Sequence, residues 1–314
     1  MTVVDLPVLR GAGWMPRRAG VPGSTSTGHA GPVPEGDTIH RSAHRLAAAL
    51  TGATLTGARA PRVVTPLPVS GTRIDGVEAR GKYLVIGFDD GTVLETHMKM
   101  SGSWHLYRPG ERWRRSPATA RVVLETADWL AVCFNAPHVV FRPALPGPGG
   151  RRAGGGDGTV RLGPDLCTPD VDLDEIVARF DRFGPPDRPL VDVLLDQRIF
   201  CGVGNVYKSE VLHACALHPD TPIDRLDGTV RRRVAEIAHR LLRANLGGGP
   251  RATWGGGLAV YRRAGSSCPR CGATVVRGLR GPHQRSTYWC EGCQHRPAPA
   301  RPRSFPPGAM TPDP

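Results

Sequence analysis

The chain contains 314 residues and has a formal net charge of +13, with an isoelectric point of about 10.1. This length allows two domains with buried cores, and the charge favours a polyanionic partner such as nucleic acid. Arginine supplies nearly all of the positive charge and only three lysines occur, so the base composition of the genome can account for part of it. No apolar run approaches the roughly 18 residues of a transmembrane helix, and no apolar segment follows Arg17 and Arg18 as it would in a signal peptide. These features exclude a membrane-spanning protein and predict a cytoplasmic one.

The N-terminal segment, residues 1–33, is rich in Gly, Pro, Ser and Thr and shows no hydrophobic period. It is predicted to be disordered, or to be an extension created by a misassigned start codon. A helix is predicted to follow directly, because Asp37 and Thr38 are favourable N-cap residues. Apolar residues then recur at helical spacing: Ile39, Ala43, Leu46, Ala47 and Leu50.

Residues 54–141 change to short apolar or alternating runs separated by Gly, Asp and Pro. This pattern is typical of an antiparallel β-sandwich, so residues 34–145 are predicted to form the first domain. Residues 146–160 are rich in Gly and Pro and predict a flexible hinge. Helices are predicted within the second domain, residues 161–264, over 173–183, 190–197, 205–214 and 230–245.

Two Cys-x-x-Cys pairs, Cys268 with Cys271 and Cys290 with Cys293, are separated by 18 residues. Four thiolates at this spacing form a closed tetrahedral shell, which predicts one structural Zn²⁺ in a ribbon over residues 265–296; a redox dithiol is the alternative. The tail, residues 297–314, is predicted to be disordered. The remaining cysteines have apolar neighbours and are predicted to be buried in a reducing compartment: Cys133, Cys167, Cys201 and Cys215.

Pro34, in the run Val33-Pro34-Glu35-Gly36, can be a nucleophile only if it is the first residue of the mature chain. Inside a chain its ring nitrogen is an unreactive amide, whereas as the first residue it would be a secondary amine able to form a Schiff base. The alternative is an ordinary Pro-Gly loop before the helix. The chemistry of this segment therefore depends on where the mature chain begins.

Three further segments are candidate anion sites. Gly204 and Asn205 lie in a glycine-rich turn that leads into a helix, where backbone N–H groups bind phosphates; a packing turn is the alternative. Arg285 lies between the cysteine pairs and has the forked geometry for a phosphate, although it can equally be a solvated arginine. Lys82 opens an apolar strand, where its ammonium is either functional or an ordinary strand-edge charge.

Together these segments resemble the formamidopyrimidine-DNA glycosylase/endonuclease VIII family of base-excision repair enzymes, from Pro34 to about Gln294. Pro34-Glu35-Gly36 is similar to the family's N-terminal motif after removal of the initiating Met, and Lys82 falls at its catalytic lysine. The segment from Leu194 to Asn205 resembles its helix-two-turns-helix DNA clamp, and Arg285 its zinc-finger arginine. The resemblance implies an α+β fold: an N-terminal helix plus antiparallel β-sandwich, then a helix-two-turns-helix domain with a C-terminal zinc ribbon.

The resemblance also implies a mechanism and a partner. Pro34 would attack C1′ of a damaged nucleotide, Glu35 would move protons, and Lys82 and Arg285 would hold phosphates, with β,δ-elimination cutting the strand. Damaged double-stranded DNA would be the partner of a monomeric bacterial enzyme, bound also through Gly204 and Asn205. Lys99 and Met100 lie in a segment that resembles the family's void-filling loop, and core packing of Met98 and Met100 is the alternative. Val33 would be the true start, encoded by GTG and read as methionine.

The branch of the family is indicated by a missing motif. The 8-oxoguanine branch carries Arg-Arg-Phe-Gly where this chain has Asn135-Ala136-Pro137-His138, which favours the endonuclease VIII branch and oxidised pyrimidines. Pro34 to Thr38 is most similar to the start of second-type actinobacterial endonuclease VIII. Three alternatives stay open: an 8-oxoguanine-type glycosylase, a damaged-DNA-binding protein without catalysis, and a zinc-ribbon interaction protein.

Overall fold

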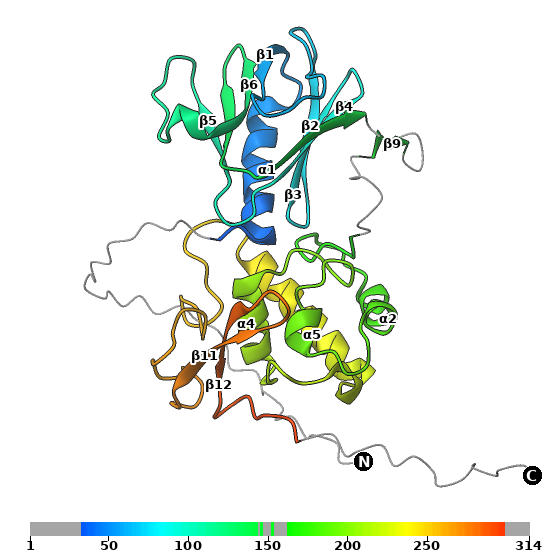
Figure 1. The fold of residues 1–314 in the computed structure, drawn as a ribbon, viewed down its shortest axis with the longest axis vertical. Coiled ribbons are helices and arrows are strands. Elements are labelled where there is room, and N and C mark those ends of the chain that lie inside the picture. Colours follow the sequence, from blue (N-terminus) through cyan, green and yellow to red (C-terminus); the bar gives the residue numbers. More distant parts are fainter. Residues whose placement is uncertain (1–32, 144, 147–151, 154–161, 299–314) are drawn as a thin grey trace, which may run out of the picture. The chain divides into compact units, whose positions relative to one another are not determined.

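The structure, a computed structural model, describes residues 33–143, 145–146, 152–153 and 162–298 (Figure 1). The predicted N-terminal extension, the hinge and the C-terminal tail lie almost entirely outside these residues. All described residues belong to one unit, residues 32–314. Within the described ranges, no helix is long and apolar enough to cross a membrane.

The first element is helix α1 (Gly36–Leu50), whose N-cap is Glu35. The predicted caps Asp37 and Thr38 are therefore wrong, because both lie inside the first turn. Asp37 is fully buried there and neutralises Arg251 rather than capping the helix. The predicted apolar stripe is confirmed, since Ile39, Ala43, Leu46 and Leu50 are buried on one face while Ala47 is half-buried.

The predicted antiparallel β-sandwich is confirmed as two four-stranded sheets (Figure 1). One sheet has the order β1 (Leu55–Arg59), β6 (Ala120–Thr126), β7 (Leu130–Phe134), β5 (Ser103–Tyr107). The other has the order β2 (Ile74–Arg80), β3 (Tyr83–Phe88), β4 (Thr92–His97), β8 (His138–Pro143). A short 3₁₀ helix, Pro117–Thr119, precedes β6. Side chains from both sheets and from α1 share one apolar core, so α1 is held in place by hydrophobic burial.

Two short strands pair antiparallel: β9 (Leu145–Pro146), which crosses the predicted start of the hinge, and β10 (Arg152–Ala153), which lies within it. The helical domain follows, with α2 (Leu173–Phe183), α3 (Leu190–Val193), α4 (Asn205–Ala214), a 3₁₀ turn (Ile223–Arg225) and α5 (Gly228–Ala244). The helix predicted over 190–197 is wrong beyond Val193. There the Asp196 carboxylate accepts hydrogen bonds from the backbone N–H and guanidinium of Arg198, which holds a turn instead of a helix.

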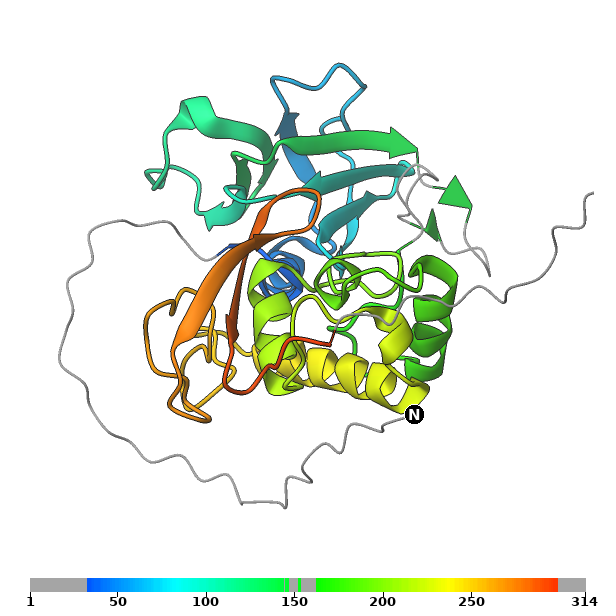
Figure 2. The same ribbon diagram turned by 60° about the horizontal axis from the view of Figure 1, so that its bottom comes forward.

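The C-terminal hairpin, β11 (Val275–Arg280) and β12 (Arg285–Cys290), packs against α4 (Figure 2). Its apolar core contains only five buried residues, two of them cysteines: Ala259, Val260, Cys268, Val275 and Cys290. Such a core is too small to stabilise a ribbon without a further cross-link.

Candidate functional site

Glu35 ties the start of α1 to the start of α4. Its side chain is 1% exposed, and its carboxylate accepts N–H bonds from Gly204 at 2.9 Å, Val206 at 2.7 Å and Tyr207 at 3.2 Å. Gly204 is required at this point because a Cβ there would collide with the Glu35 carboxyl group. The helix N-terminus does hold an anion, but that anion is Glu35 instead of the phosphate predicted for Gly204.

Burial raises the pKa of Glu35, against the opposing effects of Arg251, Lys82 and the backbone N–H donors. A carboxyl group with a raised pKa keeps its proton to a higher pH than an exposed one, which suits it to donate that proton. Pro34 precedes it and is half-buried. In the full-length chain its nitrogen is acylated by Val33, whose carbonyl oxygen accepts a hydrogen bond from Arg251 at 3.3 Å.

Lys82 follows a turn that is fixed to the second domain. Gly81 adopts a left-handed φ of 57°, and a Cβ there would collide with Cys201. The Gly81 N–H donates to Asp165 at 2.6 Å, and the same carboxylate oxygen contacts His40 Nε2 at 2.9 Å. The structure thereby holds Lys82 at the junction of the two domains.

The Lys82 ammonium shares its surroundings with Glu35 and Arg285. Burial lowers the pKa of Lys82 to about 8; Glu35 opposes this shift and Arg285 adds to it. Lys82 therefore lies within electrostatic reach of two other predicted catalytic residues, Glu35 and Arg285. Arg285 itself is exposed at the start of β12.

Asn205 connects α4 to this hairpin. Its Nδ2 donates to the carbonyl oxygen of Ser286 at 2.8 Å. Ser286 follows Arg285, so the contact sets where the Arg285 backbone lies relative to α4. Since Nδ2 carries two hydrogens, one remains for a phosphate oxygen.

Lys208 is a site residue that the sequence did not reveal. It is fully buried, and its Nζ donates to Asn205 Oδ1 at 2.7 Å, Thr287 Oγ1 at 2.8 Å and Ser286 O at 3.3 Å. An ammonium only donates, so it fixes the Asn205 amide with its oxygen toward Lys208 and its Nδ2 toward Ser286. Burial lowers the pKa of Lys208 to about 7. The available signal was its spacing of three residues from Asn205 on one helix face.

Arg251 is the second residue that was missed. Its guanidinium donates to Asp37 at 2.9 and 2.6 Å and to Thr38 Oγ1 at 3.0 Å, and it lies 5.1 Å from the ring of Tyr207. It therefore clamps the first turn of α1 onto α4. Nothing in the sequence distinguishes it from the other arginines.

The turn after β4 separates its two methionines. Met98 is 1% exposed in the sandwich core, whereas Met100 is 64% exposed. Lys99 between them has a left-handed φ of 48°, and its N–H donates to His97 Nδ1 at 3.0 Å. The core-packing alternative thus holds for Met98, and Met100 presents an apolar side chain to solvent beside the exposed Lys99.

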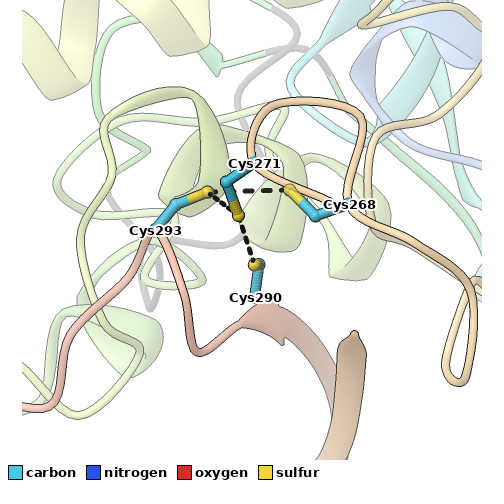
Figure 3. A group of neighbouring side chains, drawn as sticks. All are labelled: Cys268, Cys271, Cys290 and Cys293. Atoms are coloured by element: carbon cyan, nitrogen blue, oxygen red, sulfur yellow. Dashed lines mark hydrogen bonds between the residues drawn. The ribbon is translucent and has the colours of Figure 1, made fainter. Parts of the chain in front are cut away.

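The four cysteines converge on one point (Figure 3). The Sγ atom of Cys271 lies 3.5 Å from that of Cys290 and 3.1 Å from that of Cys293, and the Sγ atoms of Cys268 and Cys293 are 3.6 Å apart. Metal–sulfur bonds of about 2.3 Å in a tetrahedron require sulfur separations of about 3.8 Å. The cluster therefore fits a metal ion with four thiolate ligands. The other four cysteines are buried, as predicted.

Comparison with known proteins gives two family matches. The N-terminal domain of formamidopyrimidine-DNA glycosylase matches residues 33–140, and its H2TH domain matches residues 162–252. A probable endonuclease 8 2 of Streptomyces coelicolor is 39% identical over 85% of this chain and 96% of its own length. A DNA-(apurinic or apyrimidinic site) lyase Nei2 of Mycolicibacterium smegmatis is 37% identical over 83% of this chain and 99% of its own length.

A solved structure gives the same fold. Formamidopyrimidine-DNA glycosylase of Lactococcus lactis, non-covalently bound to DNA containing an AP site, superposes with a TM-score of 0.67. It is 20% identical and covers 83% of this chain and all of its own. The chain belongs to the formamidopyrimidine-DNA glycosylase family.

Proposed function

We propose that this protein is a bifunctional DNA glycosylase and AP lyase that removes oxidised bases from damaged DNA through a Schiff base on Pro34. The observation that carries the proposal is the binding of Glu35 to the N-terminus of α4. It brings the start of α1 to the helix whose first residue, Asn205, holds the Arg285 hairpin. The names of the relatives, an endonuclease 8 and a DNA-(apurinic or apyrimidinic site) lyase, support the lyase part of this proposal.

The active form would begin at Pro34. The match to the family begins at residue 33, which supports a start at Val33 and removal of the initiating residue. The free secondary amine of Pro34 would then attack C1′ of the damaged nucleotide, and the base would leave with the electron pair of its bond to C1′. Glu35, whose pKa is raised, would give a proton to the sugar ring oxygen as the ring opens and an iminium forms.

Strand cleavage would follow from the iminium, because it acidifies C2′. Loss of a C2′ proton expels the 3′ phosphate, and a second elimination expels the 5′ phosphate; water then releases Pro34. The Lys82 ammonium, Arg285 and the second hydrogen of Asn205 Nδ2 would hold the phosphates and stabilise developing charge. Met100, exposed at its turn, would fill the space left when the damaged nucleotide leaves the stack.

Zn²⁺ would hold the ribbon together through Cys268, Cys271, Cys290 and Cys293, and the closed thiolate shell leaves it no open position for catalysis. A monomer is proposed because the proposed chemistry needs the residues of a single chain. Oxidised pyrimidines are the proposed lesions. The connection between β7 and β8 contains only Asn135, Ala136 and Pro137, which leaves no hairpin to insert opposite the lesion.

Borohydride trapping on an abasic-site oligonucleotide tests the proposal. Protein that begins at Pro34 should form a covalent adduct, and the 314-residue chain, with an acylated proline, should not. An adduct with neither form would leave a DNA-binding protein without catalysis as the better account. DNA affinity that does not fall with salt would contradict any role in DNA binding.

A further inference from the structure

A histidine that the site described above does not use reaches the cysteine cluster from helix α4. His213, in the last turn of α4, is 1% exposed, and its Nε2 lies 3.3 Å from the Sγ atom of the buried Cys268. Cysteines bind a metal as thiolates, which can only accept hydrogen bonds. In the metal-bound cluster, therefore, Nε2 donates this bond. The cluster is tied in this way to a helix that supplies none of its four thiolates.

A second contact joins the same cysteine to the same end of α4. Arg270 lies between the first two cysteines, and its backbone N–H donates to Cys268 Sγ at 3.4 Å. Its guanidinium donates to the carbonyl oxygen of Ala214, the last residue of α4, at 3.3 Å. A cation is favourable beside the C-terminal carbonyl groups of a helix. The Cys268 sulfur thus has one N–H donor from its own loop and one from α4.

Trp254 covers one side of this junction. Its ring lies 5.9 Å from the His213 ring, edge to face, and 5.7 Å from the Arg270 guanidinium. The hydroxyl of the neighbouring Thr253 is bonded to the buried carboxylate of Glu210, three residues before His213 on α4. Trp254 is therefore anchored to the same helix. A hydrogen bond is stronger where water is kept away, so this cover favours the contact between His213 and Cys268.

The contacts of the ribbon extend along one face of α4. Asn205 bonds the hairpin at the first turn, and Ser209 Oγ accepts the Tyr288 N–H at 3.3 Å. His213 bonds Cys268 at the last turn. Asn205, Ser209 and His213 are spaced by four residues, which places them on the same side of the helix. Helix α4 thus supports both the hairpin and the cysteine cluster.

We propose that His213 is a positioning residue for the metal, which stabilises the Cys268 thiolate and holds the loaded cluster against α4. This inference rests on the proposed Zn²⁺ and not on the chemistry of Pro34. Four thiolates around one Zn²⁺ carry two excess negative charges, and an N–H group aimed at a sulfur stabilises this charge. Groups that hydrogen-bond a metal ligand change metal affinity by about 10–100-fold when they are removed.

The test measures the Zn²⁺ affinity of the 314-residue chain by competition with a chelator. His213→Phe keeps a ring beside Trp254 but has no donor, and it should bind Zn²⁺ about 10–100-fold more weakly. His213→Gln places an amide N–H₂ where the imidazole donor was, and it should recover most of this loss. The matched control is His239→Phe, which removes a half-buried histidine that contacts Leu166 O at 3.0 Å and none of the four cysteines. It should bind Zn²⁺ as the unaltered chain does.

Co²⁺ in place of Zn²⁺ gives a second readout, which a loss of packing would not reproduce. The thiolate-to-metal absorption should move to longer wavelength in His213→Phe, because a sulfur without its hydrogen bond gives up an electron more easily. It should stay in place in His213→Gln. Circular dichroism checks that the variants fold, and His213→Leu, smaller and also without a donor, replaces His213→Phe if the phenylalanine is not accommodated.

Two results would overturn the inference: unchanged Zn²⁺ affinity in the variant without a donor, or equal losses in that variant and His213→Gln with no shift in absorption. An unaltered chain that binds no Zn²⁺ would overturn the metal assignment and this inference with it. Borohydride trapping decides the proposed enzyme function separately, so the failure of one does not imply the failure of the other.

Discussion

The two halves of the site are held by different physical means. Pro34, Glu35 and Lys82 lie on elements fixed by a continuous apolar core and by backbone contacts, whereas Arg285 lies on a hairpin with a core of five residues. The hairpin depends instead on four thiolates and on the polar contacts of Lys208 with Asn205 and Thr287. The comparison teaches that loss of the proposed metal should detach the half that is proposed to bind phosphates, while the half that carries the proposed nucleophile stays folded.

Removal of the proposed metal should have the largest effect on the structure and should also weaken DNA binding. Structural Zn²⁺ contributes about 10–16 kcal/mol in small ribbons, so Cys290→Ser should release the hairpin and lower DNA affinity by about 100-fold or more as the Arg285 and Asn205 phosphate contacts are lost. Metal content and DNA binding are measured together, with Cys133→Ala, a buried thiol of the sandwich, as the control. Full DNA affinity without bound metal would contradict the division into halves.

Glu35→Gln should come next, because it removes the proposed proton donor at the centre of the first half. Base excision should fall by about 10²–10⁴-fold, the usual contribution of a general acid. The adduct on a preformed abasic site should fall much less, since there the sugar can open without Glu35. Glu236→Gln, on the exposed side of α5, is the matched control and should change neither reaction.

Met98 and Met100 lie in one turn, but replacing them should affect different properties: protein stability for Met98 and DNA binding for Met100. Met98→Ala should lower the free energy of unfolding by about 2–5 kcal/mol because it leaves a cavity in the sandwich core. Met100→Ala should change stability by less than about 0.5 kcal/mol and weaken duplex binding at a lesion. Denaturant unfolding and binding assays on both variants check the pair, and reversed effects would show that Met100 is not the wedge.

Lys208→Met should weaken DNA binding by about 10-fold, because the Asn205 amide loses the donor that fixes its orientation. A double-mutant cycle with Asn205→Ala measures the coupling, and the two losses should not add. If the losses of DNA affinity in the two variants add, Lys208 does not act through Asn205 and contributes only through its contacts with the hairpin.

The smallest predicted effect is on the pH dependence of the lyase activity. The pKa of Lys82 is lowered to about 8 in the free protein, so its ammonium is present below that pH and lost above it. Lyase kcat/KM, which reports the free enzyme, should therefore fall as pH rises through about 8. In Lys82→Arg the side chain stays charged, so the fall in kcat/KM above about pH 8 should disappear even if the activity is lower. If kcat/KM of Lys82→Arg still falls above about pH 8, the group that loses its proton there is not Lys82.

The sequence predicted what depends on local pattern. Alternation predicted the sandwich, and the Cys-x-x-Cys spacing predicted the thiolate cluster. The helix cap at Glu35 and the end of α3 at Val193 were missed because carboxylate contacts outweigh local preference there. Lys208 and Arg251 were missed for another reason: Thr287, which Lys208 bonds, lies 79 residues away in the chain, and Asp37, which Arg251 bonds, lies 214 residues away. Met98 and Met100 are two residues apart and would share a face in a continuous strand; the left-handed turn at Lys99 separates them, and no sequence pattern indicated that turn.

Mass spectrometry of the borohydride-trapped adduct tests the central claim most directly. Protein that begins at Pro34 is trapped on abasic-site DNA and digested, and the modified residue is located. The mass of the reduced sugar fragment should be found on the Pro34 nitrogen and on no lysine. An adduct on Lys82 or Lys208, with Pro34 unmodified, would contradict the proline mechanism while leaving the family and the fold intact.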